Sequence, residues 1–233
     1  LQERNKACEI IEDLGGSVHN GPNFDASTTH LIIGNGNISR NEKLLACIAS
    51  GKWVLHRSYL DACRRNNSFV DEEPYEWGGE FSSSDMAAMD SKLQSVLASC
   101  SRWRQQAYSG QGGAYQGWSV LLHVDPNKED SFKRILDAGK ATVFSKQEMF
   151  SIASLTFAVL DSVRLKELSQ GELQDLRKHR IPVLKLDYLA DYLIETDLKL
   201  DNYYLPEFRK MELSDSMKSI GSLSSARKSK RLL

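Results

Sequence analysis

The chain has 233 residues, of which 41% are hydrophobic, enough for one or two domains with real cores. Its net charge of −1 is unevenly divided: residues 209–233 contain seven Lys/Arg and two Asp/Glu, a net +5, which leaves −6 on the other 208 residues. An acidic body argues against non-specific duplex binding, which requires many phosphates to be neutralised. No apolar run approaches the roughly 20 residues of a membrane span. Four dispersed cysteines argue against a zinc knuckle.

The first part of the chain predicts short apolar strands alternating with amphipathic helices. A glycine pair, Gly15-Gly16, follows the first helix, and Gly51 ends the second one. The apolar residues Leu44, Leu45 and Ile48 share one face of that second helix. The expected elements are a helix over about 3–14, a short strand at 17–18, a strand over 29–33, a helix from 41 and a strand over 53–55.

Two cations stand at the start of the helix that begins at Asn41. Arg40 and Lys43 lie where the helix dipole is positive, which disfavours basic side chains by roughly 0.3–1 kcal/mol each. One explanation is that an anion from elsewhere binds at this helix end. The same two residues, taken alone, also fit solvated surface charges.

The second part of the chain repeats the pattern of the first. Gly139, Thr156 and Pro182 follow their counterparts in the first part at offsets of 124, 127 and 129 residues. Three blocks that recur in order indicate two copies of one unit of about 90 residues. Apolar, β-branched strands between helices favour a small parallel sheet covered on both sides. The second copy is expected to contain a strand over 118–124, a helix over 131–138, strands over 156–160 and 182–184, and a helix over 188–193.

These residues together resemble the BRCT family. The first copy carries the resemblance in Leu14-Gly15-Gly16, Thr29-His30-Leu31-Ile32, Gly51-Lys52-Trp53-Val54, and Tyr59 with Cys63. The second copy keeps Gly139, Pro182-Val183-Leu184 and Tyr188 to Leu193, but has no Gly-Gly pair and no Thr-His. Arg40 to Lys43, Gly51 to Leu60 and Tyr75 to Gly78 are also similar to the C-terminal BRCT pair of the topoisomerase II-binding protein family.

The resemblance implies an α/β fold of two BRCT repeats. Each repeat would be a small parallel four-stranded sheet flanked by helices, and the repeats would pack through a three-helix interface. The expected division is repeat one over 1–78, a linker with a helix (about 86–108) over 79–116, repeat two over 117–208, and a disordered basic tail over 209–233. We also expect the first strand of repeat one to be missing from this chain.

The resemblance implies phosphoserine or phosphothreonine recognition at repeat one. Lys43 falls on the lysine that such modules place against the phosphate, and Arg40 and Arg4 lie near the same pocket. A dianionic phosphate at a helix N-terminus gains free N–H groups and a charge-assisted bond from lysine. The Ser/Thr that completes such a pocket is expected before Leu1. Lys128, in the loop after the first strand of the second copy, matches a basic position of the peptide groove.

The function implied is a non-catalytic scaffold that binds phosphorylated proteins of DNA replication, repair and checkpoint signalling in the nucleus. The basic stretch 227–231 fits a nuclear localisation signal. The sequence contains no catalytic motif, cofactor loop or metal-ligand spacing, so no enzyme or cofactor is expected. Two alternatives stay open: a phosphate-independent architectural module and a DNA-end-binding module. The chain is expected to be a monomer or a ligand-dependent dimer, with no membrane association.

Overall fold

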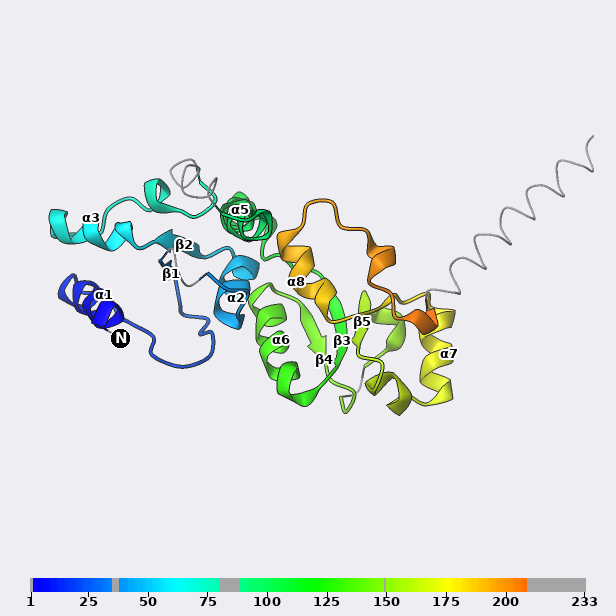
Figure 1. Ribbon diagram of the computed structural model, residues 1–233. Coiled ribbons are helices and arrows are strands. Elements are labelled where there is room, and N and C mark those ends of the chain that lie inside the picture. The colour runs from blue at the N-terminus through cyan, green and yellow to red at the C-terminus, as the bar shows by residue number, and fades with distance from the viewer. Residues whose placement is uncertain (1, 35–37, 80–88, 149, 209–233) are drawn as a thin grey trace, which may run out of the picture. The chain divides into compact units, whose positions relative to one another are not determined.

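A computed structural model describes residues 2–34, 38–79, 89–148 and 150–208 (Figure 1). The chain forms two compact units. Unit 1 comprises residues 1–119, 126–143 and 189–198, and unit 2 comprises 120–125, 144–188 and the residues from 199 onward. The basic tail predicted over 209–233 lies outside the described residues.

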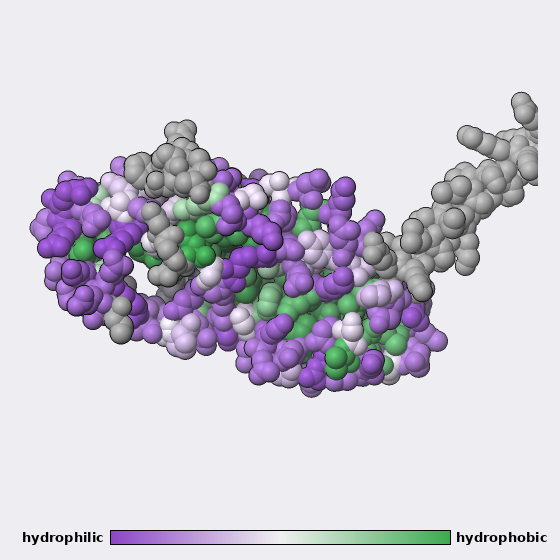
Figure 2. Space-filling model, in the orientation of Figure 1, coloured by the Kyte–Doolittle hydropathy of each residue, from purple (hydrophilic) through white to green (hydrophobic). Residues whose placement is uncertain are grey.

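Unit 1 contains a small parallel sheet, its surrounding helices and the linker helix. Its elements before residue 120 are α1 (Gln2–Asp13), β1 (His30–Ile33), α2 (Glu42–Ser50), β2 (Trp53–His56), α3 (Ser58–Asn66), η1 (Glu73–Tyr75), α5 (Ser91–Gln106) and η3 (Ala107–Gln111). Each predicted helix and strand of this part is confirmed within a few residues, apart from the strand at 17–18. Hydrophilic residues cover the outer surface over α1 and α3 (Figure 2).

Helix α2 is defined by its two ends. The Asn41 side chain accepts a hydrogen bond from the Leu44 N–H at the first turn, and Gly51 ends the helix in the left-handed conformation, with φ of 65°. Asparagine is a preferred N-cap, and glycine alone adopts this φ without steric cost. A Cβ on Gly51 would lie 2.4 Å from the Cβ of Ala107, so the close approach of α5 also requires glycine there.

The sheet of unit 1 is smaller than predicted. Strands β1 and β2 pair in parallel from His30 with Trp53 to Ile33 with His56. Within the described ranges, these two strands make up the whole sheet. A BRCT repeat was predicted to have four strands, of which the first was expected to be missing from this chain. The prediction of a strand at Ser17-Val18 is wrong: this segment is a loop, and none of the described strands pairs with it.

The linker helix α5 packs on unit 1 against α2 and β2. Its Arg104 donates two hydrogen bonds to the Glu76 carboxylate, of 2.5 and 2.7 Å, and both residues are buried. The Arg104 guanidinium also lies 3.8 Å from the ring centre of Trp53. The prediction of a helix in the linker is therefore confirmed, over Ser91–Gln106, and part of the predicted span falls in the undescribed residues 80–88.

Two later helices complete unit 1. They are α6 (Pro126–Ala138) and the residues from 189 onward of α8 (Asp187–Ile194). Helix α2 packs against α6 (Figure 1). Arg40, which precedes α2, forms an ion pair with Asp191 of α8. The residues predicted for the three-helix interface are buried, apart from Phe132, which is half-buried. The buried ones are Leu44, Leu45, Ile48, Ile135, Leu136, Leu189 and Leu193.

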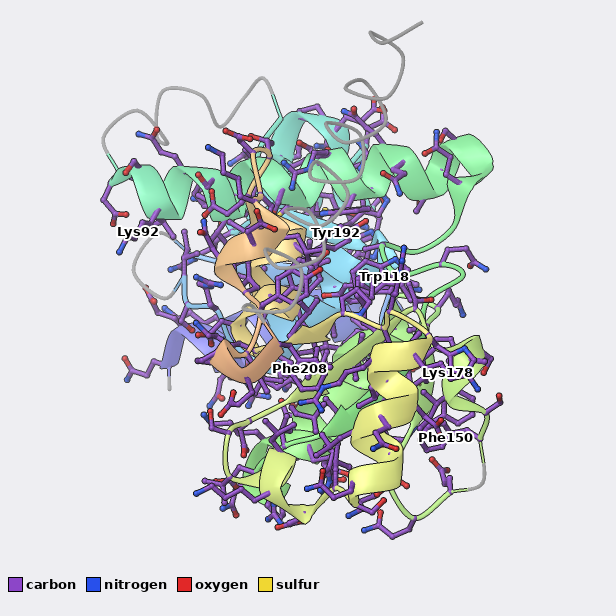
Figure 3. The ribbon with its side chains drawn as sticks, turned by 90° about the vertical axis from the view of Figure 1, so that its right-hand side faces the viewer. Lys92, Trp118, Phe150, Lys178, Tyr192 and Phe208 are labelled. Carbon is purple, nitrogen blue, oxygen red and sulfur yellow. The ribbon has the colours of Figure 1, made fainter. Side chains whose placement is uncertain are left out.

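Aromatic packing and linker contacts fix α8 within unit 1. Tyr192 of α8 lies against Trp118, with ring centres 4.6 Å apart (Figure 3). The last carbonyl groups of α8 accept hydrogen bonds from the linker: Trp103 Nε1 and Arg102 Nη2 both donate to the Leu193 oxygen, at 2.7 and 2.6 Å. A helix end whose carbonyl groups find donors in another helix is satisfied without a cap of its own.

Unit 2 contains most of the second sheet. Strands β3 (Ser119–His123), β5 (Phe157–Leu160) and β6 (Val183–Leu184) pair in parallel, and with β4 (Thr142–Phe144) the strand order is β4-β3-β5-β6. This confirms the four-stranded sheet predicted for the second copy. The remaining elements are η4 (Ile152–Ser154), η5 (Arg164–Glu167), α7 (Gln170–Lys178) and η6 (Leu200–Asn202).

The two copies share a structural detail that follows the last strand of each. After the last strand of each copy, the chain returns and makes one antiparallel bridge to it: Leu55 with Glu76 in the first, and Leu184 with Tyr204 in the second. The offsets of these pairs agree with the repeat spacing read from the sequence. The bridges therefore support the interpretation of two copies of one unit.

Candidate functional site

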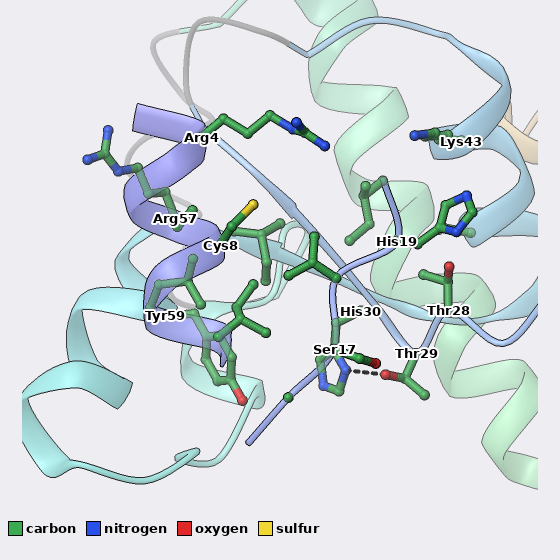
Figure 4. Close-up of a pocket in the computed structure, with 18 of the residues that line it drawn as sticks. Arg4, Cys8, Ser17, His19, Thr28, Thr29, His30, Lys43, Arg57 and Tyr59 are labelled. Carbon is green, nitrogen blue, oxygen red and sulfur yellow. Dashed lines mark hydrogen bonds between the residues drawn. The ribbon is translucent and has the colours of Figure 1, made fainter. Parts of the chain in front are cut away.

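The candidate site is a cavity of about 1100 Å³ in unit 1 (Figure 4). Helix α1, the loop from Gly15 to Thr29, strand β1, the first turn of α2 and the start of α3 surround it. Its apolar wall includes Ile11, Leu31 and Leu60, and cationic, acidic and hydroxyl side chains also line it. The cavity therefore combines an apolar wall with a polar rim.

Lys43 lies on this rim, in the first turn of α2. Its Nζ donates a hydrogen bond of 2.6 Å to the Gly21 carbonyl oxygen and is partly buried. An ammonium group has three donors, so two are left for a ligand. The predicted lysine is thus at a helix N-terminus and at a cavity, as phosphate recognition requires.

Arg4 reaches the same side of the cavity from α1. Its Nη2 donates a hydrogen bond of 2.7 Å to Asn20 Oδ1. In Figure 4 the Arg4 guanidinium and the Lys43 ammonium point toward one another across the rim. The structure therefore brings together two of the four predicted site residues, from elements about 40 residues apart in the chain.

Glu42, the residue before Lys43, carries a negative charge that is paired with another residue. Arg134 of α6 donates two hydrogen bonds to its carboxylate, of 2.7 and 2.8 Å, and the Phe24 N–H donates a third. These bonds, above all those from Arg134, lower the pKa of Glu42 from 4.5 to about 2. The Glu42 carboxylate therefore binds Arg134 and the Phe24 N–H, and the Lys43 ammonium is available to a ligand in the cavity.

Three carboxylates line the cavity, and each is engaged with a neighbour. Asp25 accepts bonds from the N–H and hydroxyl of Ser27, which lowers the pKa of Asp25. Glu3 pairs with Arg57, and Glu72 lies 3.0 Å from His30 Nε2. The three acids cancel the formal charge of Arg4, Lys43 and Arg57, so the cavity has no net positive charge, but Lys43 and Arg4 are bonded to neutral oxygens of the loop.

The other two predicted residues lie away from the cavity. Arg40 pairs with Asp191. Lys128 is exposed in the first turn of α6, where the sequence predicted a loop: Pro126 begins the helix earlier than expected. Neither residue lines the cavity, so the structure does not join them to Lys43 and Arg4.

Sequence reasoning did not single out the loop segment His19-Asn20-Gly21. This segment supplies both oxygens that hold Lys43 and Arg4, and His19 lies beside Lys43 (Figure 4). It has no hydrophobic period and no motif, so nothing local marks it. Only the folded chain shows that His19 lines the cavity and that the next two residues bind its cations.

Comparisons with known proteins identify both copies. The BRCA1 C Terminus (BRCT) domain family matches residues 1–64, and the TopBP1/SLF1 BRCT domain family matches residues 112–204. The SMC5-SMC6 complex localization factor protein 1 of Homo sapiens is 31% identical over 176 residues, 74% of this chain and 15% of that protein. A BRCT domain-containing protein of Arabidopsis thaliana is 27% identical over 225 residues, 91% of this chain and 16% of that protein.

The chain therefore spans about 15–16% of the length of these relatives. Among solved structures, the BRCT5-BRCT6 domains of S. pombe Brc1 align with a TM-score of 0.55 and 18% identity, over 87% of this chain and 92% of theirs. This likeness shows the same fold, with parallel sheets flanked by helices. The chain belongs to the BRCT family and carries two BRCT domains in tandem, the second of the TopBP1/SLF1 type.

Proposed function

We propose that this chain is a non-catalytic module that binds a phosphorylated serine or threonine of a partner protein in the cavity of unit 1. Lys43 and Arg4 are the phosphate contacts. The observation that carries the proposal is their convergence: two cations from different helices are anchored to adjacent residues of one loop, at the rim of one cavity.

The chemistry of the rim suits a phosphate monoester. Lys43 and Arg4 each use one donor on the loop, and their remaining N–H groups are available for phosphate oxygens. The positive end of the α2 dipole adds to their field. Hydroxyl groups of Ser17, Thr28 and Thr29 also line the cavity and offer further donors.

The polypeptide on either side of the phosphate would extend from this rim. We assign Lys128 to the groove that receives it, because its side chain is exposed at the start of α6. Arg40 is assigned to an acidic residue of the peptide or to the phosphate, after exchange of its Asp191 partner. The exposed fraction of the Arg40 side chain, 46%, permits such an exchange.

The relatives support a setting for this activity. The human relative is by name a localization factor of the SMC5-SMC6 complex, and the second domain is of the TopBP1/SLF1 type. We therefore place the chain among nuclear scaffolds that bind phosphorylated proteins in DNA repair, replication and checkpoint signalling. The acidic body makes direct DNA binding the weaker candidate.

The test is selection from an oriented phosphopeptide library, with the unphosphorylated library as reference. We expect phosphate-dependent binding that Lys43→Met weakens by about tenfold or more, since bonds between charged groups are the strong ones. Lys92→Met is the matched control, because Lys92 is exposed on the linker helix and outside the cavity.

Three other results would contradict the proposal. Equal affinity of a folded Lys43→Met variant would remove the assignment of the site. Binding without phosphate preference would favour an architectural module. Binding of duplex DNA with a steep dependence on salt would favour a DNA-binding module.

A further inference from the structure

We propose that His19 is a third phosphate contact, and that its protonation makes phosphopeptide binding tighter as the pH falls toward 6.5. This inference rests on the proposed function and adds a residue and a pH response to the same site. The observations that carry it are the position of the His19 ring beside Lys43 and the free hydrogen-bonding capacity of that ring.

The position of His19 follows from the loop that holds the two cations. Arg4 is bonded to Asn20 and Lys43 to Gly21, the two residues that follow His19. The backbone at His19 is thus tied between α1 and α2. In Figure 4 the imidazole lies next to the Lys43 side chain, with Thr28 on its other side.

Glycine at position 21 lets the ring lie there. A Cβ on Gly21 would come within 2.5 Å of His19 Nε2, so the ring occupies the space that any other residue would fill. The His19 side chain is 41% exposed. Its Nδ1 lies 3.9 Å from Asp25 Oδ2, which is longer than a hydrogen bond. Within the described part of the chain, the ring nitrogens of His19 make no hydrogen bond.

The other histidines of the cavity are engaged differently. His30 has Nδ1 2.8 Å from Thr29 Oγ1 and Nε2 3.0 Å from Glu72. His56 has Nδ1 2.7 Å from Ser58 Oγ. Their rings are held by the protein, whereas the ring of His19 can turn a donor toward a ligand.

The charges around His19 determine how it responds to a ligand. Lys43 from α2 and Arg4 from α1 oppose a positive charge on the imidazole, and Asp25 of its own loop favours one. The other charged or titratable groups lining the cavity near neutral pH are Glu3, His30, His56, Arg57 and Glu72. A phosphate dianion among the cations reverses the local field and favours the imidazolium. Ligand binding and proton uptake by His19 are therefore coupled, and histidine changes charge in the range of about pH 5–8.

The test compares phosphopeptide affinity between pH 8.0 and 6.5 for the full chain and its His19→Gln variant. The probe is the peptide enriched from the oriented library, labelled for fluorescence anisotropy. We expect affinity to rise about threefold or more toward pH 6.5 in the unsubstituted chain, and to lose this rise in His19→Gln. Glutamine keeps a donor but does not titrate. The second ionisation of the phosphate, near pH 6, weakens binding at low pH equally in both proteins.

His179→Gln is the control, because His179 is exposed at the end of α7 and does not line the cavity. It should keep the full pH dependence. Parallel pH profiles for the unsubstituted chain and a folded His19→Gln variant would overturn the role of His19 and leave the proposed function intact. No phosphate-dependent binding by the unsubstituted chain at any pH would overturn the proposed function and this inference together.

Discussion

The buried ion pair between Glu76 and Arg104 should hold the linker helix on the first BRCT domain. Both side chains are almost fully buried, with 3% and 9% exposed, and two hydrogen bonds join them. Glu76→Gln removes the negative charge and leaves the guanidinium without a counter-ion. Removing one partner of a buried pair costs about 3–5 kcal/mol. The remaining amide oxygen accepts one N–H and returns about 1 kcal/mol, so we expect a loss of roughly 2–4 kcal/mol.

The assay is urea unfolding followed by tryptophan fluorescence. All four tryptophans lie in unit 1, so the signal reports the unit that contains the pair. Glu73→Gln is the matched control, because Glu73 is exposed three residues away, and it should change the free energy of unfolding by less than about 0.5 kcal/mol. A double variant, Glu76→Leu with Arg104→Met, should be more stable than Glu76→Gln, since it leaves no unpaired charge. A loss below about 1 kcal/mol for Glu76→Gln would show that the pair contributes little to holding the linker helix.

Two further predictions concern ionisable groups of unit 1. The pKa of Glu42, about 2, is lowered mainly by Arg134, so Glu42 stabilises the fold above pH 4.5 and loses this contribution as the pH falls toward 2. Arg134→Met should raise the pKa of Glu42 toward 4.5. It should also reduce the difference between the free energies of unfolding at about pH 7 and about pH 3. A carboxyl NMR titration of the variant that still gives Glu42 a pKa near 2 would contradict this. Burial raises the pKa of the Cys47 thiol to about 12, whereas Cys8 is partly exposed. A thiol reagent at pH 8 should modify Cys8 in the native chain and Cys47 only on unfolding, and rapid native labelling of Cys47 would be the opposite result.

Local signals in the sequence were sufficient for most elements of the fold. The helix between Asn41 and Gly51 carries its own N-cap and C-cap residues and an apolar face, so its bounds could be read directly. The strand predicted at Ser17-Val18 failed because a strand of two residues depends on a neighbour that the local sequence does not specify. Helix α7 was not predicted, although Ser169 and Glu172 form a capping box that would have marked its start.

The site was predictable only in part, because it depends on contacts between distant residues. Lys43 could be placed at a helix N-terminus from its neighbours alone. Arg40 has the same local signal, yet its partner Asp191 stands 151 residues later, beyond any local pattern. The segment around His19 could be assigned to the site only from the structure, because its role is to accept hydrogen bonds from Arg4 and Lys43, which are distant in sequence.

The assembly of unit 1 from separate segments of the chain affects folding during synthesis. This unit draws on three separate segments, and the last of them ends at residue 198. Trp103 and Arg102 of the linker donate hydrogen bonds to the Leu193 carbonyl oxygen of α8. These bonds cannot form until nearly the whole of both BRCT domains has left the ribosome. The first domain therefore emerges before the residues that complete its packing, and a chain that stops before α8 leaves Trp103 without the carbonyl group that its indole binds and the Trp118 ring without Tyr192, where chaperones or other chains can bind.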